Sequence, residues 1–155
     1  MSEKQNLNDG LEDNTEFIGK SMYVLTRYGQ IFLDKELKPY YLKAGQLHLL
    51  FLLFKNDGMN QESLARSINV DKAAVTRAIQ KLIDEGYVTR ERNDHDKRSY
   101  RVFLTERGKA IEPDIFAIAQ KLEDIFLDSL EQDERDCIAR SLHIMKKNIV
   151  AHMKN

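Results

Sequence analysis

Apolar residues recur at helical spacing along most of the chain. From about Asn14 or Thr15 they return every three or four positions as far as Phe32, and Pro39 marks the end of this first predicted helix. A second helix is predicted over residues 47–54, where the sequence LHLLFLLF is apolar almost all round. A helix without a polar face has to be covered on all sides, so we expect this one at the centre of the fold.

Two shorter amphipathic helices come next. Asn60 is the predicted N-cap of the first and Asp71 that of the second, and Gly86 ends the second in a position that favours a left-handed backbone. Only the residues NVD separate the two helices, and this spacing predicts a helix-turn-helix. Their inward-facing residues are predicted to be Leu64, Ala65, Ile68, Val75, Ile79, Leu82 and Ile83.

The pattern then changes from helical to alternating. Two short strands are predicted over residues 87–92 and 99–104, joined by a charged loop. Thr105 is a good N-cap for a long helix, which Pro113 is expected to kink or divide, and a last helix begins near Asp133. This order of elements predicts a mainly α fold of the α+β class, a winged helix-turn-helix with extra helices at both ends.

Composition supports a helix-rich globular protein. The chain has 155 residues, of which 42% are hydrophobic and 32% charged, and no apolar run is long enough to cross a membrane. The polar, acidic start is unlike a signal peptide, so we expect a cytoplasmic protein with a disordered tail over residues 1–13. Cys137 is the only cysteine, which excludes an internal disulfide, and a half-buried helix residue is a better interpretation than a redox switch.

Charge is distributed unevenly, and the distribution favours a polyanionic partner. Residues 60–109 carry eleven basic and eight acidic side chains, whereas residues 110–155 carry six basic and nine acidic ones. Within the basic part, the outer face of the second short helix is polar, small and free of acids. Such a face suits the major groove of DNA, although an ordinary solvated face has the same composition. Its residues are Lys72, Ala73, Thr76, Arg77 and Gln80.

The charged loop between the strands is the second candidate for DNA contact. Arg98 lies near its tip, where a basic side chain can enter the minor groove. Asp94 and Asp96 would repel phosphate if left free, so we expect at least one of them to be paired internally. Asp96 can pair with an arginine and hold the loop in shape, and an ordinary solvated hairpin is the alternative. The candidate wing residues are Asp96, Lys97, Arg98 and Ser99.

Several of these segments resemble the MarR (multiple antibiotic resistance regulator) family. The most specific is the Asp-x-Arg of the loop, Asp96-Lys97-Arg98, followed by LTERG at residues 104–108; the segments VTR…LIDEGYVTR and LKAGQLHLLFLL are also similar. The resemblance implies a homodimeric DNA-binding regulator, usually a repressor, that a small phenolic or other aromatic ligand or oxidation releases. It also implies that Arg98 lies in the minor groove, and that Lys72, Ala73, Thr76 and Arg77 lie at the major groove.

The chain departs from the family pattern at three places. His95 stands where the loop commonly has a proline, and Glu131 stands where the last helix usually has a serine or threonine cap. Redox-sensing members use a cysteine near the N-terminus, which this chain lacks. Peroxide sensing is therefore not expected.

We expect residues 14–155 to form one domain. Residues 44–108 would be its winged-helix DNA-binding core, and residues 14–40 and 109–155 would supply dimerisation helices, because they carry more apolar surface than a small winged helix can cover. Family members bind effectors near the junction of these parts, although aromatic residues in such places are more often core or rim residues. The candidate effector residues are Arg27, Tyr28, Tyr40, Tyr41 and His48.

Two other classes of function are less well supported. A winged helix used only for protein contact would show a neutral recognition face, and this one is basic. An enzyme would need site chemistry, but the sequence has no phosphate-binding glycine loop or serine elbow, and His143 and His152 face opposite sides of their predicted helix. We therefore expect no enzymatic activity, cofactor or metal. Double-stranded DNA, a second copy of the chain and a small ligand are the expected partners.

Overall fold

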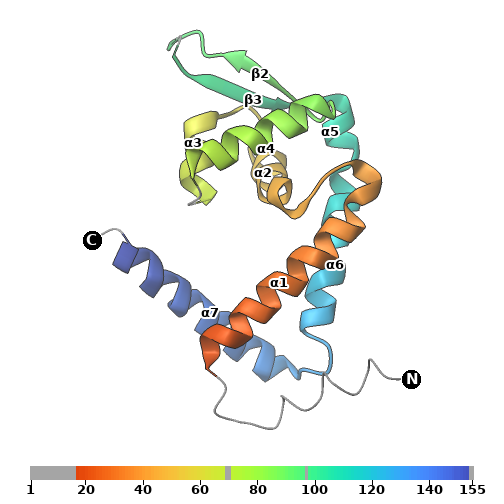
Figure 1. The fold of residues 1–155 in the computed structure, drawn as a ribbon, viewed down its shortest axis with the longest axis vertical. Coiled ribbons are helices and arrows are strands. Elements are labelled where there is room, and N and C mark those ends of the chain that lie inside the picture. The colour runs from red at the N-terminus through yellow and green to blue at the C-terminus, as the bar shows by residue number, and fades with distance from the viewer. Residues whose placement is uncertain (1–16, 69–70, 97, 154–155) are drawn as a thin grey trace. The chain divides into compact units, whose positions relative to one another are not determined.

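The structure is a computed structural model that describes residues 17–68, 71–96 and 98–153 (Figure 1). The predicted tail and the predicted start of the first helix lie outside these residues. The chain forms two compact units, Met1–Ile118 and Ala119–Asn155. Its elements are α1 (Ile18–Glu36), the 3-10 turn η1 (Lys38–Tyr40), α2 (Ala44–Lys55), β1 (Met59–Asn60), α3 (Gln61–Ile68), α4 (Lys72–Asp84), β2 (Val88–Arg92), β3 (Tyr100–Leu104), α5 (Glu106–Ala110), α6 (Glu112–Phe126) and α7 (Gln132–Met153).

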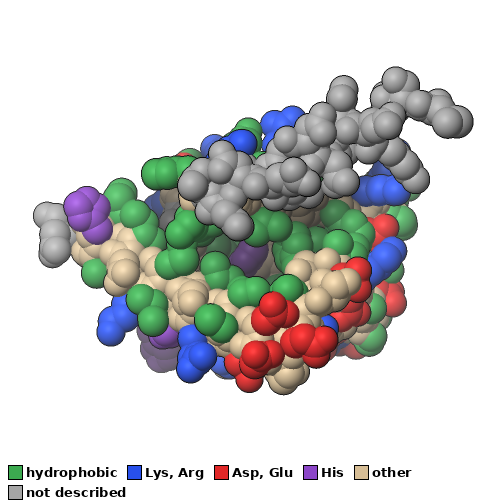
Figure 2. All heavy atoms as spheres, turned by 90° about the horizontal axis from the view of Figure 1, so that it is seen from below, with side chains coloured by type: hydrophobic (Ala, Val, Ile, Leu, Met, Phe, Trp, Pro, Cys, Tyr) green, Lys and Arg blue, Asp and Glu red, His purple; other side chains and the backbone are tan. Residues whose placement is uncertain are grey.

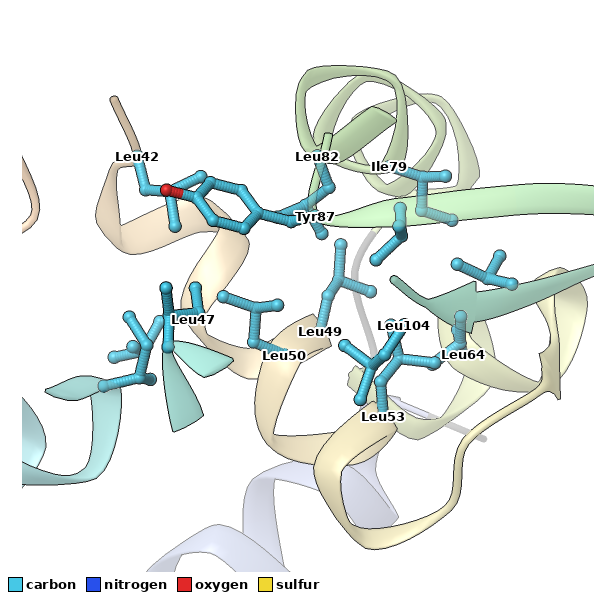
Figure 3. Close-up of a cluster of buried hydrophobic side chains, with 14 of the residues drawn as sticks. Leu42, Leu47, Leu49, Leu50, Leu53, Leu64, Ile79, Leu82, Tyr87 and Leu104 are labelled. Carbon is cyan, nitrogen blue, oxygen red and sulfur yellow. The ribbon is translucent and has the colours of Figure 1, made fainter. Parts of the chain in front are cut away.

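The predicted fold class is confirmed in the first unit, where the central element is α2. This helix packs against α1, α3, α4 and β3. Leu49, Leu50 and Leu53 are fully buried and lie among side chains from α3, α4 and the sheet (Figure 3). Phe51 and Phe54 are only half-buried, so α2 is less completely covered than its sequence predicts. Its burial holds the helix-turn-helix and the hairpin on one common core.

The sheet has three strands, whereas the alternating pattern of the sequence predicted two. Its order is β1-β3-β2, and both pairs are antiparallel. The strands β2 and β3 form the predicted hairpin, with Val88 opposite Leu104 and Arg92 opposite Tyr100. The strand β1 was missed because two residues are too few to show an alternating pattern. It joins the start of α3 to the wing, since Met59 pairs with Val102.

Most of the predicted helix ends agree with the structure. The Asn60 side chain accepts a hydrogen bond from the backbone N–H of Glu62 at 2.8 Å, and the Thr105 hydroxyl accepts one from Gly108 at 3.0 Å. Gly86 has a φ of +74°, the left-handed backbone that ends α4. Asp71 occupies the N-cap position of α4, but the prediction that its side chain caps the helix is wrong, because it makes no such hydrogen bond.

The helices α1 and α7 bury little of their apolar surface within their own units. Gly29 is the buried residue of α1, and α7 has none among the residues that the structure describes. Hydrophobic side chains are accordingly open on the molecular surface (Figure 2). Cys137 on α7 is exposed, so its predicted half-burial is wrong for the single chain. In the described part of the chain, no helix combines the length and hydropathy that a membrane span requires.

Candidate nucleic-acid interface

The helix-turn-helix presents the outer face of α4 to solvent. Its inner face, with Val75, Ile79 and Leu82, is buried against α2 and the rest of the core. The helix is amphipathic, so burying this stripe turns the remaining positions outward. All five residues proposed for the major groove are exposed, namely Lys72, Ala73, Thr76, Arg77 and Gln80.

Acidic side chains border this face, although none lies on it. Lys72 Nζ forms an ion pair with Glu62 Oε1 of α3 at 3.3 Å, and Gln80 donates a hydrogen bond to Asp84 at 2.9 Å. Arg77 makes no ion pair or hydrogen bond with the described residues, so its guanidinium is available to a ligand. The exposed pair of Lys72 and Glu62 is weak, because water screens both charges. A phosphate can therefore displace Glu62 at little cost.

The loop of the wing is organised by its own polar groups. The Asp96 carboxylate accepts a hydrogen bond from the backbone N–H of Arg98 at 3.0 Å, and the Asn93 side chain accepts one from His95 at 3.1 Å. Asp96 therefore braces the loop through the backbone of Arg98, and not through an arginine side chain as its sequence context predicted. Asp94 forms no ion pair with any described residue, and Lys97 lies outside the described residues.

Ser99 differs from the other wing candidates because it is buried. Its hydroxyl and its backbone N–H both donate to the carbonyl oxygen of Asp96, at 3.0 and 2.9 Å. Ser99 therefore belongs to the inside of the loop, where it closes the turn. Arg98 is exposed, and its side chain makes no hydrogen bond or ion pair with the described residues. The turn thus holds the backbone of Arg98 while its guanidinium stays free.

Two basic residues of β2 were not among the candidates. Arg90 and Arg92 are exposed and lie two positions apart, so they share one face of the strand. The Arg90 guanidinium lies 4.5 Å from the ring centroid of Tyr100 on β3, which orients it across the hairpin. The alternating pattern of VTRER places both arginines on one face of the strand, so the sequence alone could have identified them as candidates. They add positive charge along the strand that leads into the loop of the wing.

The five candidate effector residues do not enclose a site by themselves. Arg27, Tyr28, Tyr41 and His48 are exposed, and only Tyr40 packs against the core. The Tyr40 carbonyl accepts a hydrogen bond from the Tyr87 hydroxyl at 3.0 Å. Burial, and next a hydrogen bond with Asp114, raise the pKa of the Tyr40 phenol. No group of three or more metal-ligating side chains occurs in the part of the chain that the structure describes.

A helix-turn-helix with an exposed polar second helix, beside a hairpin with basic residues, defines the class of winged-helix transcription regulators. A family model described as MarR family matches residues 42–100. The chain is 48% identical to a MarR transcriptional regulator from Methanosarcina mazei Go1, whose crystal structure aligns over 88% of this chain and 98% of that one with a TM-score of 0.82. The protein belongs to the MarR family of transcription regulators.

Two further relatives extend this finding. The uncharacterized HTH-type transcriptional regulator YybA of Bacillus subtilis is 32% identical over 74% of this chain and 76% of its own length. A MarR family transcriptional regulator from Listeria monocytogenes, solved in a complex with 26mer DNA, is 25% identical. It covers 88% of this chain and 91% of its own, with a TM-score of 0.81. The relatives are regulators of transcription, which agrees with the expectation that this protein is no enzyme.

Proposed function

We propose that the protein is a homodimeric repressor that binds pseudo-palindromic operators in double-stranded DNA. Helix α4 would enter the major groove, and the β2–β3 wing would reach the adjacent minor groove. The observation that carries the proposal is the free guanidinium of Arg77 on the acid-free face of α4, together with the free guanidinium of Arg98 on a braced loop. Protein contact alone would not require one unpaired arginine on α4 and another on the wing, since neutral side chains could take both places.

The dimer accounts for the apolar surface that the single chain leaves open. Ile18, Leu25 and Ile31 of α1 are more than half exposed, at 64%, 52% and 53%. On α7, Ile144 and Ile149 are 57% and 58% exposed. A second copy would bury these residues in a two-fold interface, as obligate dimers do. Two-fold symmetry would then place the recognition helices about 34 Å apart, which corresponds to one turn of DNA.

The remaining features follow from the same proposal. Residues 14–40 and 109–155 would act as dimerisation helices around a DNA-binding core formed by residues 44–108. A small aromatic ligand that binds near Tyr40 would shift the spacing of the recognition helices and release the operator. A cytoplasmic location gives the protein access to the chromosome.

The test is a gel-shift titration with the DNA upstream of the protein's own gene. We expect binding that is selective over random DNA and that weakens steeply as salt rises, because phosphate contacts release counterions. Arg77→Ala should weaken the selective binding by about 1–3 kcal/mol if this contact is bidentate. Binding to no genomic fragment at low salt would refute the proposal and favour the alternative, a winged helix that binds only proteins.

The wing brace makes an unusual prediction about charge. Asp96→Ala removes a negative charge, yet it should weaken DNA binding several-fold, because it deletes the carboxylate that holds the Arg98 backbone. Asp94→Ala is the matched control: it removes the same charge from the same loop, and it should leave affinity unchanged or raise it slightly. Fluorescence anisotropy at one salt concentration compares the two. Tighter binding by both variants would contradict the brace.

A further inference from the structure

The hydroxyl group of Thr76 is fully engaged as a hydrogen-bond donor within the protein. Its single proton is donated to the backbone carbonyl of Lys72, one helical turn earlier, at 2.9 Å. The hydroxyl also accepts a hydrogen bond from the amide nitrogen of Gln61, which lies on α3, at 3.2 Å. A threonine hydroxyl has one proton and two lone pairs. Only one lone pair therefore remains for a ligand, although the residue itself is exposed.

The use of the Thr76 proton inside the protein does not depend on which way the Gln61 amide is oriented. In the orientation described, its oxygen is buried and has no hydrogen-bond partner. If the amide were reversed, that oxygen would take the Thr76 proton in place of the Lys72 carbonyl. In both arrangements the proton stays inside the protein. The Thr76 hydroxyl can therefore only accept a hydrogen bond from an external ligand. Gln61 of α3 fixes the position of this hydroxyl.

We propose that Thr76 reads the amino group of adenine or cytosine in the major groove, and that Gln61 positions it for this task. The inference rests on the proposed function, because it requires α4 to lie against DNA. In the major groove, adenine and cytosine present an amino donor, whereas guanine and thymine present acceptor atoms. Phosphate oxygens are also acceptors, so a phosphate would have to displace the Lys72 carbonyl, which already accepts the single proton of the hydroxyl. Thr76 is therefore a specificity-determining residue that makes no phosphate contact.

The test combines protein variants with DNA from which one amino group has been removed. Selection from random DNA first gives the operator of the wild type and of Thr76→Val, which lacks the hydroxyl but keeps its shape. The position whose base preference disappears in the variant is the contacted one. In that base pair, the adenine is then replaced by purine or the cytosine by a pyrimidinone, each of which lacks the amino group.

We expect the wild type to lose about fivefold in affinity on the analogue, the loss typical of one hydrogen bond. Thr76→Val should bind both DNAs equally, and Thr76→Ser, which keeps the hydroxyl, should behave like the wild type. If the valine variant is unstable, Thr76→Ala supports the same comparison. Equal losses by wild type and valine variant, or no loss by the wild type when the amino group is removed, would overturn the inference while selective binding still stands. A protein that binds no DNA would instead refute the proposed function.

Discussion

Replacing Gly108 with alanine should lower the free energy of unfolding by about 3 kcal/mol, the upper part of the range for overpacked sites. Gly108 lies in α5, and a β-carbon there would collide with the backbone carbonyl of Tyr87. That carbonyl also accepts the backbone N–H of Thr105 at 3.0 Å, and the Thr105 hydroxyl donates to Gly86 at 2.7 Å. Neither backbone can move without breaking these bonds, so the strain is not relieved cheaply. The measurement is urea unfolding at a fixed protein concentration, because the stability of the proposed dimer would depend on that concentration.

Gly45→Ala is the matched control for this experiment. Gly45 lies near the start of α2, and a β-carbon there would have no atom within 4 Å. The same substitution should therefore stabilise the protein slightly, by at most about 1 kcal/mol, because alanine restricts the unfolded chain more than glycine does. If both variants had the same stability as the wild type, this would contradict the tight packing of α5 against the segment between α4 and β2.

Asp57→Ala should cost about 2 kcal/mol of stability, the usual value for losing a hydrogen bond to a charged group. The Asp57 carboxylate accepts the backbone N–H of Leu104 at 2.7 Å, just beyond the point where β1 stops pairing with β3. A side chain thus takes the place of the next ladder bond. Without it, the N–H of a buried strand residue would have no partner. A second hydrogen bond also joins this turn to the wing, since the Arg101 guanidinium donates to the Gly58 carbonyl at 2.7 Å.

Asp57→Asn separates the acceptor from the charge. Its amide oxygen can still accept the Leu104 N–H, so this variant should lose clearly less stability than Asp57→Ala. Hydrogen exchange at the Leu104 amide reports the same bond directly, and it should accelerate most in the alanine variant. Unchanged exchange at Leu104 in that variant would show that Asp57 does not hold the end of the strand.

The sequence predicted the helices and the hairpin well because their signals are local. The apolar stripe of α4, the left-handed Gly86 and the Thr105 cap each depend on residues within a few positions of one another. The strand β1 was not predicted because two residues are too few to show a periodic pattern. It is defined by its pairing with β3. The side-chain cap assigned to Asp71 was wrong because propensity identifies a cap position without deciding the rotamer.

For the candidate site, the sequence by itself determined which residues of α4 face outward. Helical spacing places Lys72, Thr76 and Arg77 on the face opposite the buried stripe, and the Asp-x-Arg signature marks the wing. The bonds of Lys72 to Glu62 and of Thr76 to Gln61 were decided by the tertiary structure alone, because these partners lie on another helix. Gln61 reaches Thr76 from fifteen residues away, and Asp57 reaches Leu104 from forty-seven. Periodicity reports exposure along one helix, whereas a donor or acceptor is assigned only when packing brings two segments together.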